Sequence, residues 1–528
     1  MKLRFLSIAG VMAGLAVGML SAQGLEPKKL GAPPVDTWPT YNGDYSGRRW
    51  STLADINTRN VHQLSLAWVY RMGASGGVRG PIKSTPLLVN GVLYFSVPDH
   101  VFAIDARSGH ELWQFARQSK GGWHNNRGVG IYGETLYLET PDCNLVALDI
   151  KNGKERWQKQ FCDLDRFYTA TNAPIVIKNH VIVGVSGDDL DIPGFLEARD
   201  PETGDLQWHW SSVPKPGEPG SETWPNAEAM EHGGGMTWVP STYDPELNYL
   251  YLGTGNPQPV ISGKGRKGDN LFTESIVALN LDTGKLVWHF QPSPHDTHDW
   301  DAVETPVLFD GEINGKPRKL LAQASRNGFF FVLDRVTGKS VVTSEFVKTN
   351  WAKGVNAEGQ PIPNPAKEPQ IDGALVTPNQ GGAANWPPPS FDPQTGLFYV
   401  NASRDFSEYY IYDDTEKPEG WSGNDKGGSG HAMLQALDYK TGKIRWSHKW
   451  EGASVRSGVL TTAGGVLFTS DPSNNFVSLN AETGEPLWHA NLGAPVTNGP
   501  MTYKLDGTQY VVVASGDMMF GFALLGAQ

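Results

Sequence analysis

Residues 295–302 of this 528-residue chain read HDTHDWDA and combine three aspartates with two histidines. Carboxylate oxygens bind hard cations, and an aspartate can also accept a proton from a reacting group. In an extended segment, Asp299 and Asp301 would point to the same side, so that one holds a cation while its neighbour faces a substrate. His295 and His298 have a spacing found in zinc sites, but the chain shows no clear third and fourth ligand. The stretch by itself leaves three interpretations open: a solvated acidic loop, a zinc site, or a carboxylate cluster that holds a cation and moves a proton.

A repeated unit must position this stretch. Its copies are VFAIDARSGHELWQF (101–115), LVALDIKNGKERWQKQF (145–161), FLEARDPETGDLQWHW (195–210), IVALNLDTGKLVWHF (276–290), FFVLDRVTGKSVV (330–342), LQALDYKTGKIRWSHKW (434–450) and FVSLNAETGEPLWHANL (476–492). Each copy predicts a strand, a D/N-x-x-x-G turn and a second strand that usually carries a tryptophan. The turn glycines lie about 42 to 54 residues apart in most intervals, which is the size of a four-stranded propeller blade.

The two chain ends supply an eighth unit. Residues 65–72 resemble the tryptophan-bearing strand, and residues 510–524 contain two more apolar strands. We therefore predict an all-β fold, an eight-bladed β-propeller of four-stranded antiparallel blades whose ring is closed by N- and C-terminal strands. A single domain is expected over residues 23–528. Its insertions, which usually gather on the functional face of a repeat protein, are expected around 211–236, 256–272 and 343–390.

The N-terminus and the overall charge restrict location and partners. Residues 1–22 combine a basic start, an apolar run and small residues near Ala22, a pattern that predicts a cleaved signal peptide and a periplasmic or otherwise exported protein without stable membrane insertion. A formal net charge of −12 argues against a nucleic-acid partner. Cys143 and Cys162, the only cysteines, flank a predicted hairpin. In an oxidising compartment we expect them to form a disulfide, with two unpaired buried thiols as the alternative.

Several motifs identify a family. The repeats, together with STYDPELNYLYLGTGNP (241–257), ASRNGFFFVLDR (324–335) and NWPPPSFDPQTGLFYV (385–400), resemble the quinoprotein alcohol dehydrogenases of the methanol and ethanol dehydrogenase family. The resemblance covers essentially the whole mature chain. It implies a propeller that binds pyrroloquinoline quinone (PQQ) and a metal ion on its axis. It also implies oxidation of a small alcohol to the aldehyde, with electrons passed to a separate cytochrome c.

The resemblance assigns the metal ligands and the base. Asp299 takes the position of the catalytic base and Asn256 that of an amide ligand, while Asp301 matches an extra carboxylate of the lanthanide-using branch. The family's glutamate ligand falls at Asp189, one methylene shorter, with Asp188 as the alternative. Three carboxylates and an amide suit a hard cation; a lanthanide is favoured and Ca²⁺ is the alternative.

The same comparison implies the cofactor pocket. Trp238 matches the aromatic surface on which PQQ stacks, and Arg326 matches the residue that bonds the reactive quinone oxygens and stabilises the developing charge. The remaining matches are Arg127 for a PQQ carboxylate, and Thr171, Ser186, Gly187 and Asn385 for polar contacts.

Three departures from the family pattern bear on substrate and affinity. Lys83 replaces a common glutamate and is expected to pair with a PQQ carboxylate, with an ordinary surface lysine as the alternative, and Arg456 replaces a usual tryptophan. Residues 120–128 lack the family's adjacent cysteines, so that Trp123 or His124 is expected to cover PQQ, or the cofactor is held more loosely. Two other functions stay open: a PQQ-dependent sugar or polyol dehydrogenase, and a non-catalytic envelope scaffold.

Overall fold

The computed structural model describes residue 30 and residues 34–73, 80–120, 125–187, 191–413 and 420–524. Within them the chain forms eight sheets of four or five strands and one two-stranded sheet. The helices are one α-helix, α1 (Ala227–His232), and the short 3₁₀ turns η2 (Val61–Gln63), η3 (Leu164–Arg166), η5 (Ser221–Thr223) and η6 (Pro365–Lys367). The predictions for residues 1–22, 121–124, Asp188 and Asp189 lie outside the described residues.

The sheets are built from strands that are consecutive in the chain. Five of them are β3 (Leu87–Val89), β4 (Val92–Val97), β5 (His100–Asp105) and β6 (Glu111–Ala116); β7 (Gly130–Tyr132), β8 (Thr135–Glu139), β9 (Asn144–Asp149) and β10 (Glu155–Gln160); β11 (Ile175–Ile177), β12 (His180–Gly184), β13 (Phe195–Arg199) and β14 (Leu206–Ser211); β15 (Thr242–Asp244), β16 (Tyr249–Gly253), β17 (Ile276–Asn280) and β18 (Leu286–Phe290); and β19 (Val307–Ile313), β20 (Lys316–Ala324), β21 (Phe329–Asp334) and β22 (Ser340–Glu345). In each, neighbouring strands pair antiparallel.

The remaining sheets include strands from the largest insertion and from the chain ends. They are β25 (Ala374–Val376) and β26 (Ser390–Asp392) with β27 (Leu397–Ile411), β28 (Gly423–Asp438) and β29 (Ile444–Lys449); β1 (Trp50–Ser51) with β30 (Leu460–Thr462), β31 (Val466–Ser470), β32 (Asn475–Asn480) and β33 (Pro486–Asn491); β2 (Leu64–Arg71) with β34 (Met501–Leu505), β35 (Thr508–Ser515) and β36 (Met518–Leu524); and the hairpin of β23 (Ala352–Val355) and β24 (Pro361–Pro363).

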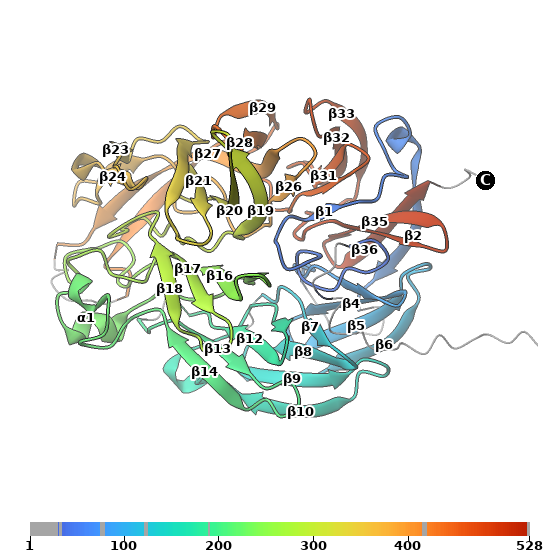
Figure 1. The fold of residues 1–528 in the computed structure, drawn as a ribbon, viewed down its shortest axis with the longest axis horizontal. Helices are drawn as coiled ribbons and strands as arrows, with labels where there is room; N and C mark the ends of the chain where they lie inside the picture. The colour runs from blue at the N-terminus through green and yellow to red at the C-terminus, as the bar shows by residue number, and fades with distance from the viewer. Residues whose placement is uncertain are drawn as a thin grey trace, which may run out of the picture.

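These sheets follow one another in chain order around a common centre, as Figure 1 shows. The N-terminal strand β2 pairs antiparallel with β36, so that the first and last parts of the described chain share one sheet. This is the pairing expected for strands that join the two chain ends. The all-β, propeller-like arrangement of four-stranded antiparallel sheets is confirmed.

Each repeated turn connects two strands of one sheet and packs against the preceding sheet. In each of the seven predicted turns, the glycine N–H donates to the backbone oxygen of the Asp or Asn four residues before it, over 2.8–2.9 Å. Gly284, for example, has a φ of +66°, and a Cβ there would lie 2.5 Å from the Trp208 ring. Trp208 belongs to the preceding sheet and donates its Nε1–H to the Leu281 oxygen over 2.7 Å. The D/N-x-x-x-G turn therefore has a second role, because its glycine leaves room for the neighbouring sheet's tryptophan.

The fifth repeat departs from this pattern. It carries Val342 where the others have tryptophan, and the next turn glycine, Gly442, faces Ser344 instead. The Ser344 hydroxyl donates to the Gly442 oxygen over 2.8 Å, which preserves a link between the two sheets.

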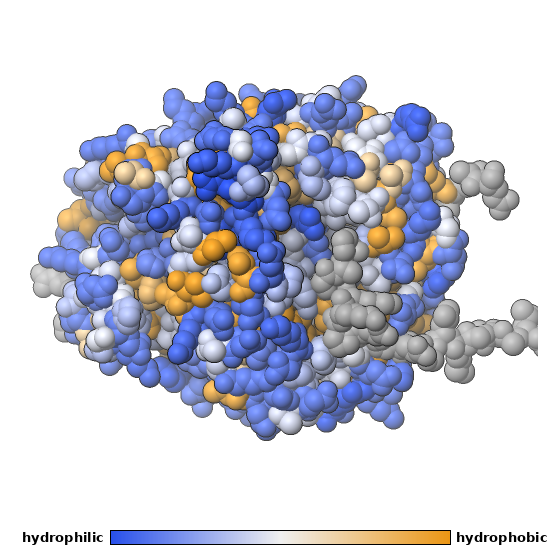
Figure 2. All heavy atoms as spheres, in the orientation of Figure 1, coloured by the Kyte–Doolittle hydropathy of each residue, from blue (hydrophilic) through white to orange (hydrophobic). Residues whose placement is uncertain are grey.

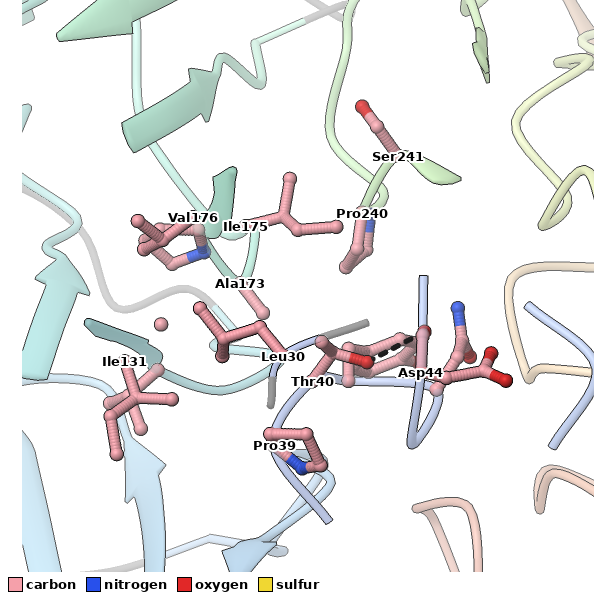
Figure 3. Close-up of a pocket in the computed structure, with 15 residues that line it drawn as sticks. Leu30, Pro39, Thr40, Asp44, Ile131, Ala173, Ile175, Val176, Pro240 and Ser241 are labelled. Atoms are coloured by element: carbon pink, nitrogen blue, oxygen red, sulfur yellow. Dashed lines mark hydrogen bonds between the residues drawn. The ribbon is translucent and has the colours of Figure 1, made fainter. Parts of the chain in front are cut away.

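The N-terminal segment makes backbone hydrogen bonds with several of the sheets. Arg49 is buried and donates to the backbone oxygens of Tyr41 and Val459. Figure 3 shows the small cavity beside this segment, with Leu30 facing Ile131 and the Thr40 hydroxyl bonded to the Asp44 oxygen. Its free volume of about 10 Å³ holds one water molecule at most. This cavity is therefore a packing gap, not a ligand site.

The three regions that we expect to be insertions differ in their local structure. Residues 211–236 contain α1, and residues 256–272 connect β16 to β17 without a strand. Within residues 343–390, β25 pairs with β27, and β26 also pairs with β27. These strand hydrogen bonds make this part of the insertion an extension of the core.

The disulfide and the molecular surface complete the description of the fold. Cys143 and Cys162 form a disulfide with a Cα–Cα distance of 4.9 Å, as expected. The face in Figure 2 is largely hydrophilic, with separate hydrophobic patches. The described residues contain no helix of the length and hydrophobicity that crossing a membrane requires.

Candidate functional site

The sheet topology brings the predicted site residues to one end of the molecule. Thr171 precedes the first strand of its sheet, β11, and Ser186 follows the second, β12. Antiparallel neighbours run in opposite directions, so the start of one and the end of the other share an edge. The other site residues hold the same two positions in their sheets: Lys83, Arg127, Trp238, Asp299, Asp301, Asn385 and Arg456 before a first strand, and Asn256 and Arg326 after a second.

The HDTHDWDA segment is a tight turn and not the extended segment that we expected. The Asp296 carboxylate accepts hydrogen bonds from the backbone N–H groups of His298, Asp299 and Trp300, over 2.8–3.2 Å. These bonds curl the backbone, and Asp299 has a left-handed φ of +64°. Burial would raise the pKa of Asp296, but its hydrogen bonds and the nearby His298 lower it. The charged Asp296 carboxylate therefore organises the segment that carries Asp299.

His298 has a packing role in this turn. Its ring stacks on Trp300 with centroids 4.3 Å apart, and its Nε2 lies 3.1 Å from the Lys367 oxygen. Tyr409 covers the same ring edge-on and donates its hydroxyl to the His298 oxygen.

Asp301 is fully buried and bonded on both oxygens. Its Oδ1 accepts the backbone N–H of Asn256 over 2.8 Å, and its Oδ2 accepts the Trp238 Nε1–H over 2.7 Å. Burial raises the pKa of Asp301, although Arg326 and both hydrogen bonds act against it. The indole of Trp238 and the loop of Asn256 are thus held by one carboxylate.

Arg326 bridges the two aspartates. Its Nη2 lies 3.4 Å from Asp299 Oδ2 and its Nη1 3.3 Å from Asp301 Oδ2. Burial would lower the pKa of Arg326, but the charges of Asp299 and Asp301 outweigh that effect and raise it. Gln380 completes the group, because its Nε2 donates to Asp299 Oδ2 over 2.9 Å and its backbone oxygen accepts from Arg326.

The predicted cofactor side is connected to this group through Trp238. The Arg127 guanidinium lies over the Trp238 ring, 4.4 Å from its centroid, and 4.9 Å from the Trp386 centroid. Arg127 also donates to the Thr171 hydroxyl over 2.6 Å, and that hydroxyl lies 2.8 Å from the Ser186 hydroxyl. Two aromatic rings, a cation and two hydroxyls therefore meet at one place.

Gly187 lies next to this group. It has a φ of +124°, and a Cβ there would lie 2.9 Å from the Phe167 oxygen. Only glycine fits this position without strain.

A cavity of about 440 Å³ adjoins this region. Lys83, Asn385, Trp386 and Arg456 line it, and the Asn385 side chain is bonded to the loop on both sides, through the Gly381 oxygen and the Trp386 N–H. A flat quinone with three carboxylates needs aromatic surfaces, cations and hydroxyl partners. The residues present fit such a group.

The predicted metal site is only partly contained in the described residues. Asn256, Asp299 and Asp301 lie together, and their oxygen chemistry fits a hard cation. In the part of the chain that the structure describes, no group of three His, Cys, Asp or Glu side chains is arranged to hold a metal ion. The fourth predicted ligand, Asp189, lies outside that part.

Some residues of this region were missed by sequence reasoning. Trp386 and Gln380 flank the predicted Asn385, in a stretch rich in Pro and Gly where an aromatic or amide group could have been noticed. Glu274 and Glu304 are buried, and burial raises the pKa of each carboxyl well above its usual value. No sequence signal distinguishes these two glutamates, because their burial arises from the packing of distant strands.

Comparisons with known proteins complete this description. A family model described as the β-propeller domain of glucose/ethanol/alcohol dehydrogenase matches residues 38–372, and a model described as outer membrane protein assembly factor BamB matches residues 430–524. The quinohemoprotein alcohol dehydrogenase of Comamonas testosteroni is 39% identical over 534 residues, covering 92% of this chain and 74% of that protein. The quinoprotein alcohol dehydrogenase PedH of Pseudomonas putida is 36% identical over 515 residues, covering 89% and 84%. A solved europium-containing methanol dehydrogenase has a TM-score of 0.87 at 30% identity, covering 94% of this chain and 99% of that one.

Proposed function

This chain belongs to the PQQ-dependent alcohol dehydrogenase family, and from that premise we propose that Asp299 is the base of its alcohol oxidation. The observation that carries the proposal is one continuous series of contacts. It runs from Ser186 through Thr171, Arg127, Trp238, Asp301 and Arg326 to Asp299. The packing of the sheets does not by itself require a proton acceptor (Asp299), a cation (Arg326) and an aromatic surface (Trp238) to lie in one continuous series of contacts.

The residues divide the work as follows. Bound PQQ supplies a quinone carbon that accepts the hydride of the alcohol. Asp299 accepts the proton of the alcohol hydroxyl, and Arg326 and Gln380 hold its carboxylate in place. The Arg326 guanidinium also stabilises negative charge that develops beside it. Trp238 and Trp386 offer stacking surfaces, while Arg127, Lys83, Thr171, Ser186, Gly187 and Asn385 bind polar groups of the cofactor.

We also propose one metal ion at Asn256, Asp299, Asp301 and Asp189. Three carboxylates balance a trivalent charge, so a lanthanide is favoured over Ca²⁺. Such an ion supplies Lewis acidity to an oxygen atom of the cofactor. The europium content of the similar methanol dehydrogenase supports this choice.

The surroundings of the enzyme follow from the same family. We propose that residues 1–22 are a signal peptide, that the mature chain works in the periplasm, and that a separate cytochrome c accepts its electrons. We also propose that the eight sheets of the single domain 23–528 are the blades of a closed ring. The pairing of β2 with β36 supports that closure.

Reconstitution tests the proposal. Purified protein is given PQQ with either La³⁺ or Ca²⁺, and the reduction of an artificial dye is measured with a series of alcohols. We expect dye reduction with La³⁺, its loss in Asp301→Ala, and a fall of about 10²- to 10⁴-fold in Asp299→Asn. Equal activity with Ca²⁺ alone would refute the proposal that the metal is a lanthanide. Full activity of Asp299→Asn would refute the proposal that Asp299 is the base.

A further inference from the structure

The 440 Å³ cavity contains more positive charge than the proposed proton transfer uses. Its lining includes the cations Lys83 and Arg456, and Asp405 is the one carboxylate among its described lining residues. No carboxylate of the described chain lies within ion-pair distance of either cation. Asp405 instead accepts the backbone N–H of Gly430 over 2.6 Å.

The two cations are presented by anchored segments. The Thr497 hydroxyl donates to the oxygen of Ile82, which precedes Lys83, over 3.2 Å. The side-chain N–H of Asn401 donates to the backbone oxygen of Ser457, the residue after Arg456, over 3.0 Å. Anchored backbones reduce the conformational entropy that these two segments lose when a ligand binds.

The charges of this region are not neutralised within the described chain. Burial lowers the pKa of Lys83, and the positive charges of Arg127 and Arg456 lower it further. Lys83 is half-buried and Arg456 is exposed, and both residues line the cavity. An anion that enters between them would relieve this repulsion.

We infer that Lys83 and Arg456 form a carboxylate-binding subsite of this cavity. The inference rests on the proposed function, since the carboxylate belongs either to the PQQ tricarboxylate or to an alcohol that also carries a carboxylate. Both sources present the same planar anion, which a guanidinium binds through two hydrogen bonds.

Two variants and one control test the subsite. Lys83→Gln and Arg456→Gln each remove one charge while they keep a polar side chain. Arg445→Gln is the matched control, because Arg445 is an exposed arginine on β29 whose side chain is 64% accessible and does not line the cavity. PQQ binding to the cofactor-free proteins is measured by quenching of tryptophan fluorescence. The reconstituted enzymes are assayed with ω-hydroxyhexanoate, which carries a carboxylate, and with n-hexanol, which does not, and KM is determined for both alcohols.

The outcomes separate the two sources. If the carboxylate is the cofactor's, the Kd of PQQ rises about tenfold or more in both variants and not in the control. If it is the substrate's, the Kd of PQQ is unchanged, and KM rises about tenfold for ω-hydroxyhexanoate while it stays constant for n-hexanol. Variants that match Arg445→Gln in both measurements would overturn the inference.

Failure of the proposed function would look different. A wild-type protein that binds no PQQ and oxidises no alcohol refutes that function. The subsite is then judged with benzene-1,3,5-tricarboxylate, a flat tricarboxylate without a quinone. Tighter binding of this probe to the wild type than to both variants supports the subsite, and equal binding refutes it.

Discussion

At the residue scale, the charge balance of the site depends on Arg326. Its guanidinium is buried and lies within 3.4 Å of two carboxylates, those of Asp299 and Asp301. Two buried carboxylates so close together would repel each other without a cation between them. A lysine at this position would place a single point charge where the planar fork of Arg326 now reaches both partners. The arginine is therefore a specific requirement of this geometry.

Glu139 gives a residue-scale prediction on pH. It is fully buried in β8, and burial raises the pKa of its carboxyl well above 4.5. The folded state then holds a proton that the unfolded state releases, so this residue's contribution to the free energy of unfolding falls as pH rises above about 4.5. Glu139→Gln should gain stability relative to wild type as pH rises from 5, by up to about 1.4 kcal/mol per pH unit until the pH reaches the raised pKa of Glu139.

Urea unfolding of cofactor-free protein at pH 5, 6 and 7 measures this difference. Glu202→Gln is the control, because Glu202 is exposed in a turn and its substitution should show no such trend. A stability difference for Glu139→Gln that stays constant over this pH range would contradict the prediction.

At the element scale, the contact between a turn glycine and the preceding sheet's tryptophan is the repeated joint of the fold. In five cases the indole N–H donates to a backbone oxygen of the next turn: Trp68 to Ala106, Trp113 to Ile150, Trp208 to Leu281, Trp288 to Arg335 and Trp446 to Ala481. The ring packs against the glycine while its N–H satisfies a carbonyl. One residue type thus supplies both the apolar contact and the hydrogen bond.

Substitution of a turn glycine separates packing from backbone strain. Gly284→Ala should lower the free energy of unfolding by about 2–4 kcal/mol, because it adds left-handed strain and a clash with the Trp208 ring. Gly315→Ala is the matched control: its φ is +73°, but nothing lies within 4 Å of the added Cβ, so about 1–2 kcal/mol of strain is expected. Denaturant unfolding of both variants measures the difference. Equal losses would mean that the tryptophan contact contributes nothing.

At the scale of the whole molecule, the two ends of the described chain share a sheet. The last strand is therefore expected to contribute strongly to the stability of the fold. β36, the last described strand, pairs with β35 on one side and with the N-terminal strand β2 on the other. Without β36, β2 loses the only strand with which it pairs and β35 keeps only β34, so that both expose a strand edge.

Truncation tests this role. A chain that ends at Asp517 should fail to give a monomeric protein with the wild-type circular dichroism spectrum, since β2 and Trp68 lose their packing. A chain that ends at Leu524 is the control and should behave as wild type. Size-exclusion chromatography and thermal unfolding measure both. If the shorter chain is as stable as the control, pairing of the chain ends is dispensable.

Much of the fold and several site positions could be predicted from the sequence alone. The D/N-x-x-x-G turn and the alternating strands can be recognised from short stretches of contiguous residues, because local backbone geometry depends on near neighbours. The motifs around Asn256, Asp299 and Arg326 predicted residues that the structure brings into one group. The Cys143–Cys162 pair could likewise be predicted from a short hairpin.

Only the tertiary structure decided how these residues meet. The left-handed turn at Asp299, the position of Arg127 near two tryptophan rings and the lining of one cavity by both Lys83 and Arg456 have no local signal. Each depends on residues that are tens to hundreds of positions apart and belong to different sheets. Their distances are set by the way the sheets pack around the centre, and no short stretch of sequence contains that information.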